Sequence, residues 1–457
     1  MRSKRPFSLW REVGGGKSCH RISTNPQSPM PDDIRARLKR LRQAGRKRRR
    51  QPPRGPEAPQ EEPTPRPVES STIAHHARES ATDLAHLPGM EEVESPWGRY
   101  LLRILRFPLA HRQGRVSLGE VLGLDAEAVR MLAESSEFDF RRAVFLDTET
   151  SGLAGGAGTI VFLTGVGAFE GDAYVVRQYF ARNPAEERAY LPDLARLLAE
   201  RGGLVTFNGR SFDWPLLRSR FILAGVTPPQ AEPHLDLLIP ARRLWRPRLG
   251  ACHFGNLEQR ILGHDRRGLD IPSWMIPSLW FRFARGEGSA REMEAVLYHN
   301  QEDIVSMAPL AHVMAATLAG LHDPHPHDWL ALARIYVRAG RSDQAEMAYR
   351  RALDHPLPPA LRAQAMRELA ALFKRRGRRA EAAVWWRALV EMLPQDINAL
   401  VELAKYYEWE ARDMEKARAV TEEAIRRAKT WRSPRERARA LEALERRLAR
   451  LMRKLTK

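Results

Sequence analysis

Three consecutive strand patterns constrain the fold of this chain more than any other feature. The segments AVFLDTET, TIVFLTGVGAF and AYVVRQYFA begin at Ala143, Thr159 and Ala173 and are rich in β-branched and aromatic residues. A Glu-Gly-Asp turn at residues 170–172 separates the second from the third and predicts a hairpin. The patterns that follow predict a helix at about 186–200, a short buried strand at 203–209 and a helix at 212–224. This order predicts an α/β domain with a mixed sheet and flanking helices.

The segments before this domain differ in composition. Residues 1–96 predict a disordered basic tail, because stretches such as QPPRGPEAPQEEPTPRP cannot maintain a helix or a sheet ladder. Ordered structure is expected to begin near Trp97, where WGRYLLRILRFPL has apolar residues at helical spacing. A second helical segment is predicted at about 119–134. Together with the strand patterns, these elements define an expected domain at 97–320.

A different pattern repeats in residues 326–457. Aromatic and small residues recur at the offsets of a tetratricopeptide repeat, in which small side chains let two antiparallel helices pack closely. The aromatic positions Tyr336, Phe373 and Tyr407 are 37 and 34 residues apart, which brackets the usual period. The basic segment from Leu441 to Leu455 is predicted to cap the last repeat. We therefore expect an all-α domain of tetratricopeptide-like repeats.

Four acidic side chains occur in three short segments of the α/β part. Asp147 and Glu149 lie in FLDTET, Asp213 lies in FNGRSFDW and Asp303 lies in YHNQEDIVSM. Carboxylates are hard anionic ligands, so four of them in one fold indicate Mg²⁺ or Mn²⁺ and phosphoryl chemistry. Asp147 and Glu149 are two positions apart on a strand, so their side chains leave the same face, whereas Thr148 points the other way.

The second segment places a turn after a buried strand and returns a carboxylate to the start of a helix. Gly209 lets the chain turn, and Asp213 lies near the helix N-terminus, where a purely structural cap is an alternative interpretation. A cap does not explain Asn208, which we interpret as a residue that orients substrate. Thr148 and Arg210 are further candidates for substrate binding.

The third segment offers two candidates for the group that orients or deprotonates water. His299 precedes Asp303 by four positions, so both lie on one face of a helix, whereas Tyr298 precedes it by five and projects to one side. The spacing favours His299 as a general base. A single histidine near a helix end is more often a surface or core residue than a catalytic one.

Taken together, the three segments resemble the DEDD exonuclease superfamily, whose motifs are DTET-like, N-G-x-x-F-D-like, and a His or Tyr followed by Asp. The segments IPSWMIPSLWFRFARGE and HNQEDIVSMAPL, at 271–287 and 299–310, more closely resemble the YprB-type ribonuclease H-like domain, which is often joined to tetratricopeptide repeats. The resemblance implies a ribonuclease H-like fold. It also implies 3′-to-5′ exonuclease chemistry with two divalent ions held by Asp147, Glu149, Asp213 and Asp303. Typical members use Tyr-x-x-x-Asp or His-x-x-x-x-Asp, and here the two spacings are exchanged, so His299 and Tyr298 both stay candidates.

Charge is distributed unevenly around this acidic quartet. The formal net charge of the chain is +19, with 20 Lys and Arg against 12 Asp and Glu in residues 1–100, 25 against 26 in 101–327, and 30 against 18 in 328–457. Basic flanks attract a phosphate backbone without specifying its sequence. The block RKRRR at 46–50 gains most from such an anionic partner. Nucleic acid is therefore the expected substrate, either DNA or RNA.

A second arginine-rich segment lies inside the α/β part. Arg242, Arg243, Arg246 and Arg248 are interleaved with Trp245, an arrangement that suits contacts to phosphate and stacking on a base. A solvated loop is an equally good interpretation. Asp236, in HLDLL, is a fifth acid that we assign to a supporting or structural role.

The remaining composition bounds the setting of the protein. Cys19 and Cys252 are far apart and lack metal-ligand spacing, which argues against a disulfide framework or a zinc finger. No apolar run reaches the roughly 20 residues that a membrane span needs. We therefore expect a cytoplasmic metal-dependent 3′-to-5′ exonuclease. The alternative is a non-catalytic scaffold that binds nucleic acid and recruits a protein partner through its repeats.

Overall fold

The computed structural model describes residues 83–152, 158–266, 268 and 270–456. The predicted basic tail is therefore outside the described residues up to residue 82. Ordered structure begins earlier than the expected start near Trp97, because the 3₁₀ turn η1 (Asp83–His86) and the strand β1 (Met90–Ser95) both precede it.

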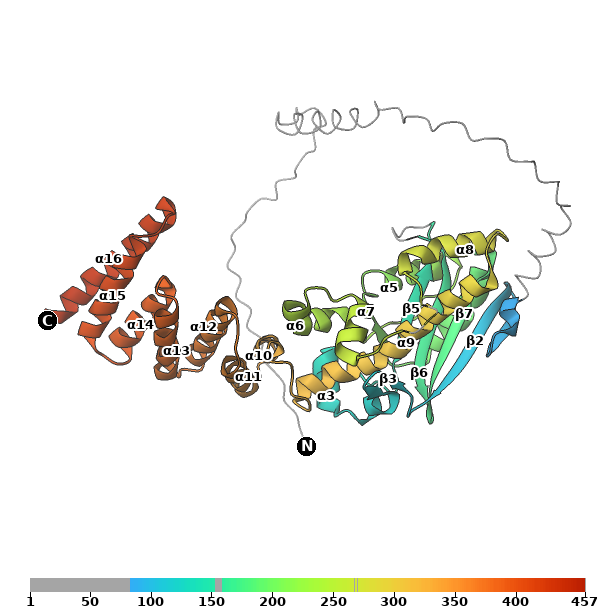
Figure 1. The fold of residues 1–457 in the computed structure, drawn as a ribbon, viewed down its shortest axis with the longest axis horizontal. Coiled ribbons are helices and arrows are strands. Elements are labelled where there is room, and N and C mark those ends of the chain that lie inside the picture. The colour runs from blue at the N-terminus through green and yellow to red at the C-terminus, as the bar shows by residue number, and fades with distance from the viewer. Residues whose placement is uncertain (1–82, 153–157, 267, 269, 457) are drawn as a thin grey trace, which may run out of the picture. The chain divides into compact units, whose positions relative to one another are not determined.

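A seven-stranded mixed sheet forms the centre of the α/β part (Figure 1). Its order is β1-β2-β7-β6-β5-β8-β9, in which β5, β8 and β9 are parallel to one another and the other neighbours are antiparallel. The six strands after β1 are β2 (Gly98–Pro108), β5 (Val144–Thr150), β6 (Val161–Glu170), β7 (Ala173–Phe180), β8 (Leu204–Thr206) and β9 (His234–Asp236). The predicted strands and the turn between β6 and β7 are thus confirmed.

The helix predicted for residues 97–109 is wrong, because this segment is the strand β2. Tyr100 and Leu101 are adjacent, each only 1% exposed, and they enter different apolar clusters on the two faces of the sheet. A strand that is buried on both faces shows a nearly continuous apolar run, which sequence periodicity does not distinguish from a buried helix. Pairing with β1 on one side and β7 on the other decides the structure.

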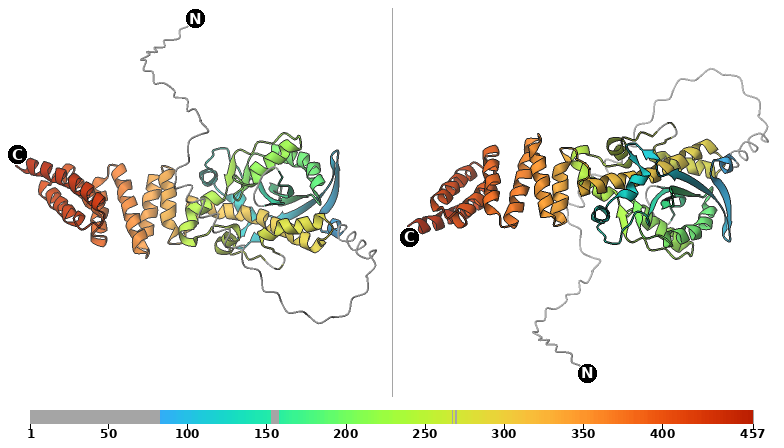
Figure 2. Two further views of the ribbon diagram at one scale, coloured as in Figure 1. Left: turned by 90° about the horizontal axis from the view of Figure 1, so that it is seen from above. Right: turned by 90° about the horizontal axis from the view of Figure 1, so that it is seen from below.

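One long helix, α9 (Ala290–Ala319), runs along one face of the sheet, as the views in Figures 1 and 2 show. A capping box between Ser289 and Glu292 begins it, and Gly320 ends it in the left-handed conformation. Two glycines on β6 let the helix and its neighbours come close to the strand. A Cβ atom on Gly165 would lie 2.2 Å from Asn300 Oδ1, and one on Gly167 would lie 2.1 Å from the Tyr174 hydroxyl.

The two faces of β5 meet different partners. Phe145 packs in the cluster that contains Ile304 of α9, whereas Val144 and Leu146 pack with residues of α4 (Glu187–Ala199) and α5 (Asp213–Leu223) on the other face. The remaining helical segments of this part are η2 (Leu118–Gly123), α3 (Ala126–Ala133), η3 (Pro184–Glu186), α6 (Leu238–Leu249), α7 (Phe254–Leu257), η4 (Glu258–Leu262), η5 (Ser273–Met275) and α8 (Ile276–Ala284), and β3 (Arg112–Gln113) and β4 (Val116–Ser117) form a small hairpin.

The C-terminal residues form helices that pack on their neighbours in sequence. Three hairpins and a final helix are described: α10 (Asp328–Arg338) with α11 (Ser342–Asp354), α12 (Pro359–Arg375) with α13 (Arg379–Met392), α14 (Ile397–Trp409) with α15 (Met414–Ala428), and α16 (Pro434–Leu455). Small residues such as Ala333, Ala345 and Ala370 are fully buried, as close packing of paired helices requires. In α16, Arg447, Arg450 and Lys454 pair with the buried Glu408 of α14. No helix among the described residues is long and apolar enough to cross a membrane.

Candidate functional site

The four predicted acids lie together at one cavity of about 750 Å³. Asp147 and Glu149 of β5, Asp213 at the start of α5 and Asp303 of α9 all line it. These residues come from three segments that are far apart in the sequence. The strand order explains the convergence, because β5 is an interior strand of the sheet, with α9 on one face and α5 on the other.

Side chains alternate between the two faces of β5, so Asp147 and Glu149 both point toward α9. Asn300 of α9 is fully buried and donates a hydrogen bond of 3.0 Å to Asp147 Oδ2. The same Asn300 accepts a hydrogen bond of 3.0 Å from Gln178 of β7, so its amide is held from two sides. Asp147 is therefore positioned by the helix that also carries Asp303.

Thr148 takes part in a different contact on the opposite face of β5. Its hydroxyl donates a hydrogen bond to Asp213, and both residues are buried. Thr148 also lines the cavity, so the structure leaves it within reach of a ligand. Its described contact is with Asp213, which it holds beside β5.

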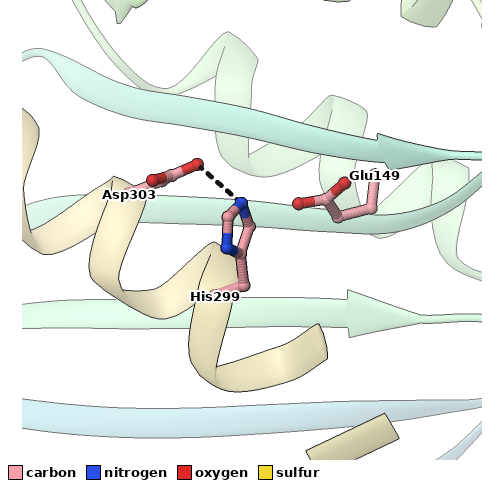
Figure 3. A group of neighbouring side chains, drawn as sticks. All are labelled: Glu149, His299 and Asp303. Atoms are coloured by element: carbon pink, nitrogen blue, oxygen red, sulfur yellow. Dashed lines mark ion pairs between the residues drawn. The ribbon is translucent and has the colours of Figure 1, made fainter. Parts of the chain in front are cut away.

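His299 lies between the acids of β5 and α9. Figure 3 shows the imidazole between Glu149 and Asp303, with Nε2 3.6 Å from Asp303 Oδ2. On the other side of the ring, Nδ1 lies 2.6 Å from Asp270 Oδ1. Nε2 is also 3.1 Å from the Ser273 hydroxyl. The carboxylate of Asp270 therefore fixes the ring so that Nε2 faces the cavity.

A buried arginine neutralises part of the acidic cluster. Arg266 makes ion pairs with Asp303 and with Glu258, at 2.8 Å for the latter, and its side chain is 9% exposed. Its guanidinium is also 3.4 Å from His299 Nδ1. Asp303 is thus held between a cationic guanidinium and the imidazole.

The other predicted site residues are less close to the acids. Asn208 is exposed and lines the cavity, and its φ of 68° places it in the left-handed region at the turn after β8. Arg210 does not line this cavity, because its guanidinium donates to the His234 carbonyl and it borders a separate hollow. Tyr298 is half-buried and is not among the residues that line the cavity.

Asp236 supports the turn that carries Asn208. Its carboxylate accepts hydrogen bonds from the backbone N–H groups of Asn208, Arg210 and Leu238 at 2.8, 3.1 and 3.0 Å. These contacts are structural, in agreement with the supporting role expected for this fifth acid.

The electrostatics of the cluster favour bound protons in the absence of a cation. Burial, followed by the charges of Asp303 and Asp213, raises the pKa of Asp147 well above its ordinary value. Burial also raises the pKa of Glu149 to about 8 and that of Asp213 to about 6. Burial by itself lowers the pKa of His299, but the hydrogen bond to Asp270 and the charges of Asp303 and Glu149 raise it to about 9.

These residues fit a divalent cation. Glu149, His299 and Asp303 each offer one ligand atom, and the three atoms lie within 4.8 Å of one another among the described residues. Carboxylates crowded in this way repel one another, and a cation removes that repulsion. Asp147 and Asp213 line the same cavity and would complete an oxygen-rich set of the kind that Mg²⁺ and Mn²⁺ prefer.

The expected stacking role of Trp245 is wrong. Trp245 is 3% exposed and packs in the apolar core beneath α6, so it offers no face to a base. Ala241, Leu244 and Trp245 lie at helical spacing and form the inner face of α6, and this apolar spacing is the signal in the sequence that places Trp245 in the core.

Several residues that shape the site were missed by sequence reasoning. They are Asn300 and Gln178 beside Asp147, Asp270 and Ser273 beside His299, and Arg266 beside Asp303. Asn300 follows His299 directly, and a polar residue inside an apolar helix is a usable signal. Arg266 and Asp270 lie in a loop without a regular pattern, where no signal in the sequence marks them.

The mixed sheet, the long helix across it and the acids at its centre define a ribonuclease H-like domain. The family model of the RNase_H superfamily (RNase_H_2) matches residues 144–315. The chain is also 32% identical over 336 residues to the uncharacterized protein YprB of Bacillus subtilis (strain 168), covering 71% of this chain and 80% of that protein. The chain therefore belongs to the YprB family within the RNase H superfamily.

One solved structure is similar over a smaller part of the chain. The crystal structure of MamA covers 30% of this chain and 78% of its own chain, with 15% sequence identity and a TM-score of 0.23. This likeness is too low to carry an argument about fold or function. Membership of the RNase H superfamily, by contrast, indicates a nuclease that hydrolyses phosphodiester bonds, with nucleic acid as its substrate.

Proposed function

We propose that this protein is a divalent-metal-dependent exonuclease that removes nucleotides from the 3′ end of DNA or RNA by a two-metal mechanism. The observation that carries the proposal is the convergence of Asp147, Glu149, Asp213 and Asp303 on one cavity. The polarity of degradation rests on the resemblance of the three acidic segments to DEDD exonucleases. When bound, Mg²⁺ or Mn²⁺ supplies positive charge to the scissile phosphate and lowers the pKa of a coordinated water.

The side chains around the acids have separate tasks in this proposal. Asp147, Glu149, Asp213 and Asp303 hold the cations, and Asn300 and Thr148 fix the orientation of Asp147 and Asp213. His299 presents Nε2 to the cavity, where it orients the attacking water or accepts its proton. Its position in the cavity favours His299 over Tyr298 for this task. Asn208, exposed at the rim, is positioned to orient substrate.

Substitution of the acids tests the proposal. We expect Asp147→Asn and Asp303→Asn to abolish Mn²⁺-dependent degradation of 5′-labelled single-stranded DNA and RNA, each resolved on a sequencing gel. In the unsubstituted protein, a ladder that shortens from the 3′ end is expected. Asp265→Asn, in an exposed position of the same part of the chain, is the matched control and is expected to retain activity. Equal degradation by the Asp303 variant and the unsubstituted protein would rule out the assignment.

A metal-binding measurement separates the enzyme from the scaffold alternative. Titration calorimetry with Mn²⁺ is expected to show binding that is lost in the Asp147 variant. A scaffold that binds only nucleic acid and a protein partner has no requirement for these carboxylates and would bind nucleic acid equally well without them.

A further inference from the structure

The four arginines of α6 project in different directions. Arg248 makes an ion pair of 2.8 Å with the buried Asp328 of α10, and Arg243 pairs with Glu134. Arg242 and Arg246 instead line the cavity that contains the acids. They are one helical turn apart, so their guanidinium groups leave the same face of α6.

Arg242 and Arg246 have the character of an anion-binding pair. Both are exposed, and no ion pair joins either of them to a carboxylate within the described part of the chain. An arginine presents a planar set of donors that matches the oxygens of a phosphate. These two groups line the same cavity of about 750 Å³ as the four acids, so a phosphate chain that enters the cavity can meet both sets of side chains.

Two aromatic rings line the same cavity as the arginines. Phe207 follows β8 and Phe254 begins α7, and both are half-buried and line the cavity. Their ring centroids are 4.8 Å apart in an edge-to-face arrangement, so each ring supports the other. The guanidinium of Arg266 lies 5.9 Å from the Phe254 centroid, within the range of a cation–π contact.

We propose that Arg242, Arg246 and the ring pair Phe207–Phe254 form the binding wall for a single-stranded polynucleotide whose end reaches the acidic cluster. The proposal rests on the proposed nuclease function and specifies single-stranded nucleic acid as the substrate class of that nuclease. The arginines bind phosphates on the 5′ side of the scissile bond, and the rings stack against an unpaired base.

The combination of contacts selects a single strand over a duplex. Cationic side chains alone would bind the phosphates of either form. Aromatic rings inside the cavity gain contact only with a base whose face is uncovered, and stacking on such a base favours binding. In a duplex both faces of each internal base are already covered by its neighbours.

Equilibrium binding without divalent ions tests this wall in the full chain. The probe is a 5′-fluorescein oligothymidine, and its anisotropy is followed in a chelator over a range of salt concentrations. We expect Arg242→Gln and Arg246→Gln each to weaken binding about tenfold, because each substitution removes charge-assisted hydrogen bonds to a phosphate. In the double variant, the slope of log affinity against log salt is expected to fall by about 1.4, at roughly 0.7 per lost phosphate contact.

The matched control is Arg243→Gln on the same helix. Arg243 is paired with Glu134 outside this cavity, so its removal is expected to leave affinity and salt slope unchanged. Phe254→Ala is expected to weaken binding of the single strand without a change in salt slope, since it removes stacking and no charge. The same oligonucleotide annealed to its complement is expected to bind more weakly and to be insensitive to Phe254→Ala.

A second measurement locates the probe directly. It therefore distinguishes binding at this wall from binding at the predicted basic tail. An oligonucleotide with 5-iodouracil next to its 3′ end is expected to crosslink on irradiation to peptides that contain Phe207 or Phe254. The yield should fall in the arginine double variant and stay constant in Arg243→Gln. Equal crosslinking in all variants, or a duplex that binds as tightly and responds to the same substitutions, would overturn the proposal.

The binding and crosslinking results test the wall independently of whether the protein hydrolyses nucleic acid. If the variants lose binding as expected but the unsubstituted protein does not degrade DNA or RNA with Mn²⁺, the nuclease function fails and the binding wall stands. If degradation is observed while Arg242 and Arg246 have no effect on binding or crosslinking, the wall fails and the nuclease function stands.

Discussion

At the scale of single residues, the site depends on pairs of charges that hold one another in place. The His299 ring lies between Asp270 on one side and the acids Asp303 and Glu149 on the other. Burial opposes a charge on the ring, but the hydrogen bond to the Asp270 carboxylate, with Asp303 and Glu149 beside the ring, raises the pKa of His299 to about 9. The metal-free protein therefore carries an imidazolium inside the acidic cluster at neutral pH.

Removal of the Asp270 charge should change this protonation. In chelator-treated Asp270→Asn protein, we expect the pKa of His299 to fall from about 9 toward its ordinary value of 6.5, because its hydrogen-bond partner, the strongest influence that raises this pKa, becomes neutral. A histidine-ring NMR titration measures the change. Asp265→Asn serves as control, since this exposed acid makes no described hydrogen bond to His299. An unchanged His299 titration in Asp270→Asn would show that the contact with Asp270 does not set the pKa of His299.

At the scale of elements, the site depends on how closely α9 approaches β6. Gly165 has no side chain, and Asn300 occupies the space that a Cβ atom would fill. Asn300 in turn donates to Asp147, so the glycine on one strand positions an acid on the next. A backbone position without a side chain thus contributes to the site without lining it.

The substitution Gly165→Ala should disturb both packing and the site. The added Cβ would lie 2.2 Å from Asn300 Oδ1, so we expect a loss of about 1–3 kcal/mol in the free energy of unfolding, as for other overpacked cores. Urea denaturation measures this, and nuclease activity should fall with it. In Gly123→Ala the added Cβ meets nothing within 4 Å, so this variant is expected to be nearly as stable as the parent. Similar stability of the two variants would contradict the close-approach argument.

At the scale of the whole molecule, the acidic cluster couples stability to pH. Glu149 and Asp213 keep their protons in the folded state up to about pH 8 and pH 6, whereas their ordinary pKa values are 4.5 and 3.8. Between these values the folded state binds more protons than the unfolded state. The free energy of unfolding of the metal-free protein therefore falls as pH rises through this window. His299 acts in the same direction, since its raised pKa also contributes stability below its ordinary value that is lost as pH rises to about 9.

Divalent ions should reverse this loss. We expect Mn²⁺ to raise Tm more near pH 8 than near pH 6, because at the lower pH the ion must displace protons from the same carboxylates. Thermal melts with and without Mn²⁺ at the two pH values measure the difference. In the Asp147→Asn, Glu149→Gln double variant, both the pH dependence and the Mn²⁺ effect should be reduced. A gain in Tm that is the same at both pH values in the parent protein would contradict the linkage.

The sequence patterns predict most elements of the α/β part correctly, and they are wrong at β2. The β5, β6 and β7 patterns and the hairpin turn were recognised because alternation and turn residues are local signals. The apolar spacing at 97–109 predicts a helix, but the segment forms β2, because its pairing with β1 and β7 depends on partners that are distant in the sequence. The helical hairpins of the C-terminal part followed from repeated small and aromatic residues.

By itself the sequence determined the acids Asp147, Glu149, Asp213 and Asp303 as candidates, since strand alternation and helix spacing are local geometry. The tertiary structure decided which other residues surround these acids and His299. It placed Arg266 beside Asp303, Asn300 beside Asp147 and Asp270 beside His299. It also turned Arg210 and Trp245 away from the cavity and left Arg242 and Arg246 facing it. Such choices depend on contacts between segments far apart in the chain, and a local pattern contains no information about which distant side chain will fill the adjoining space.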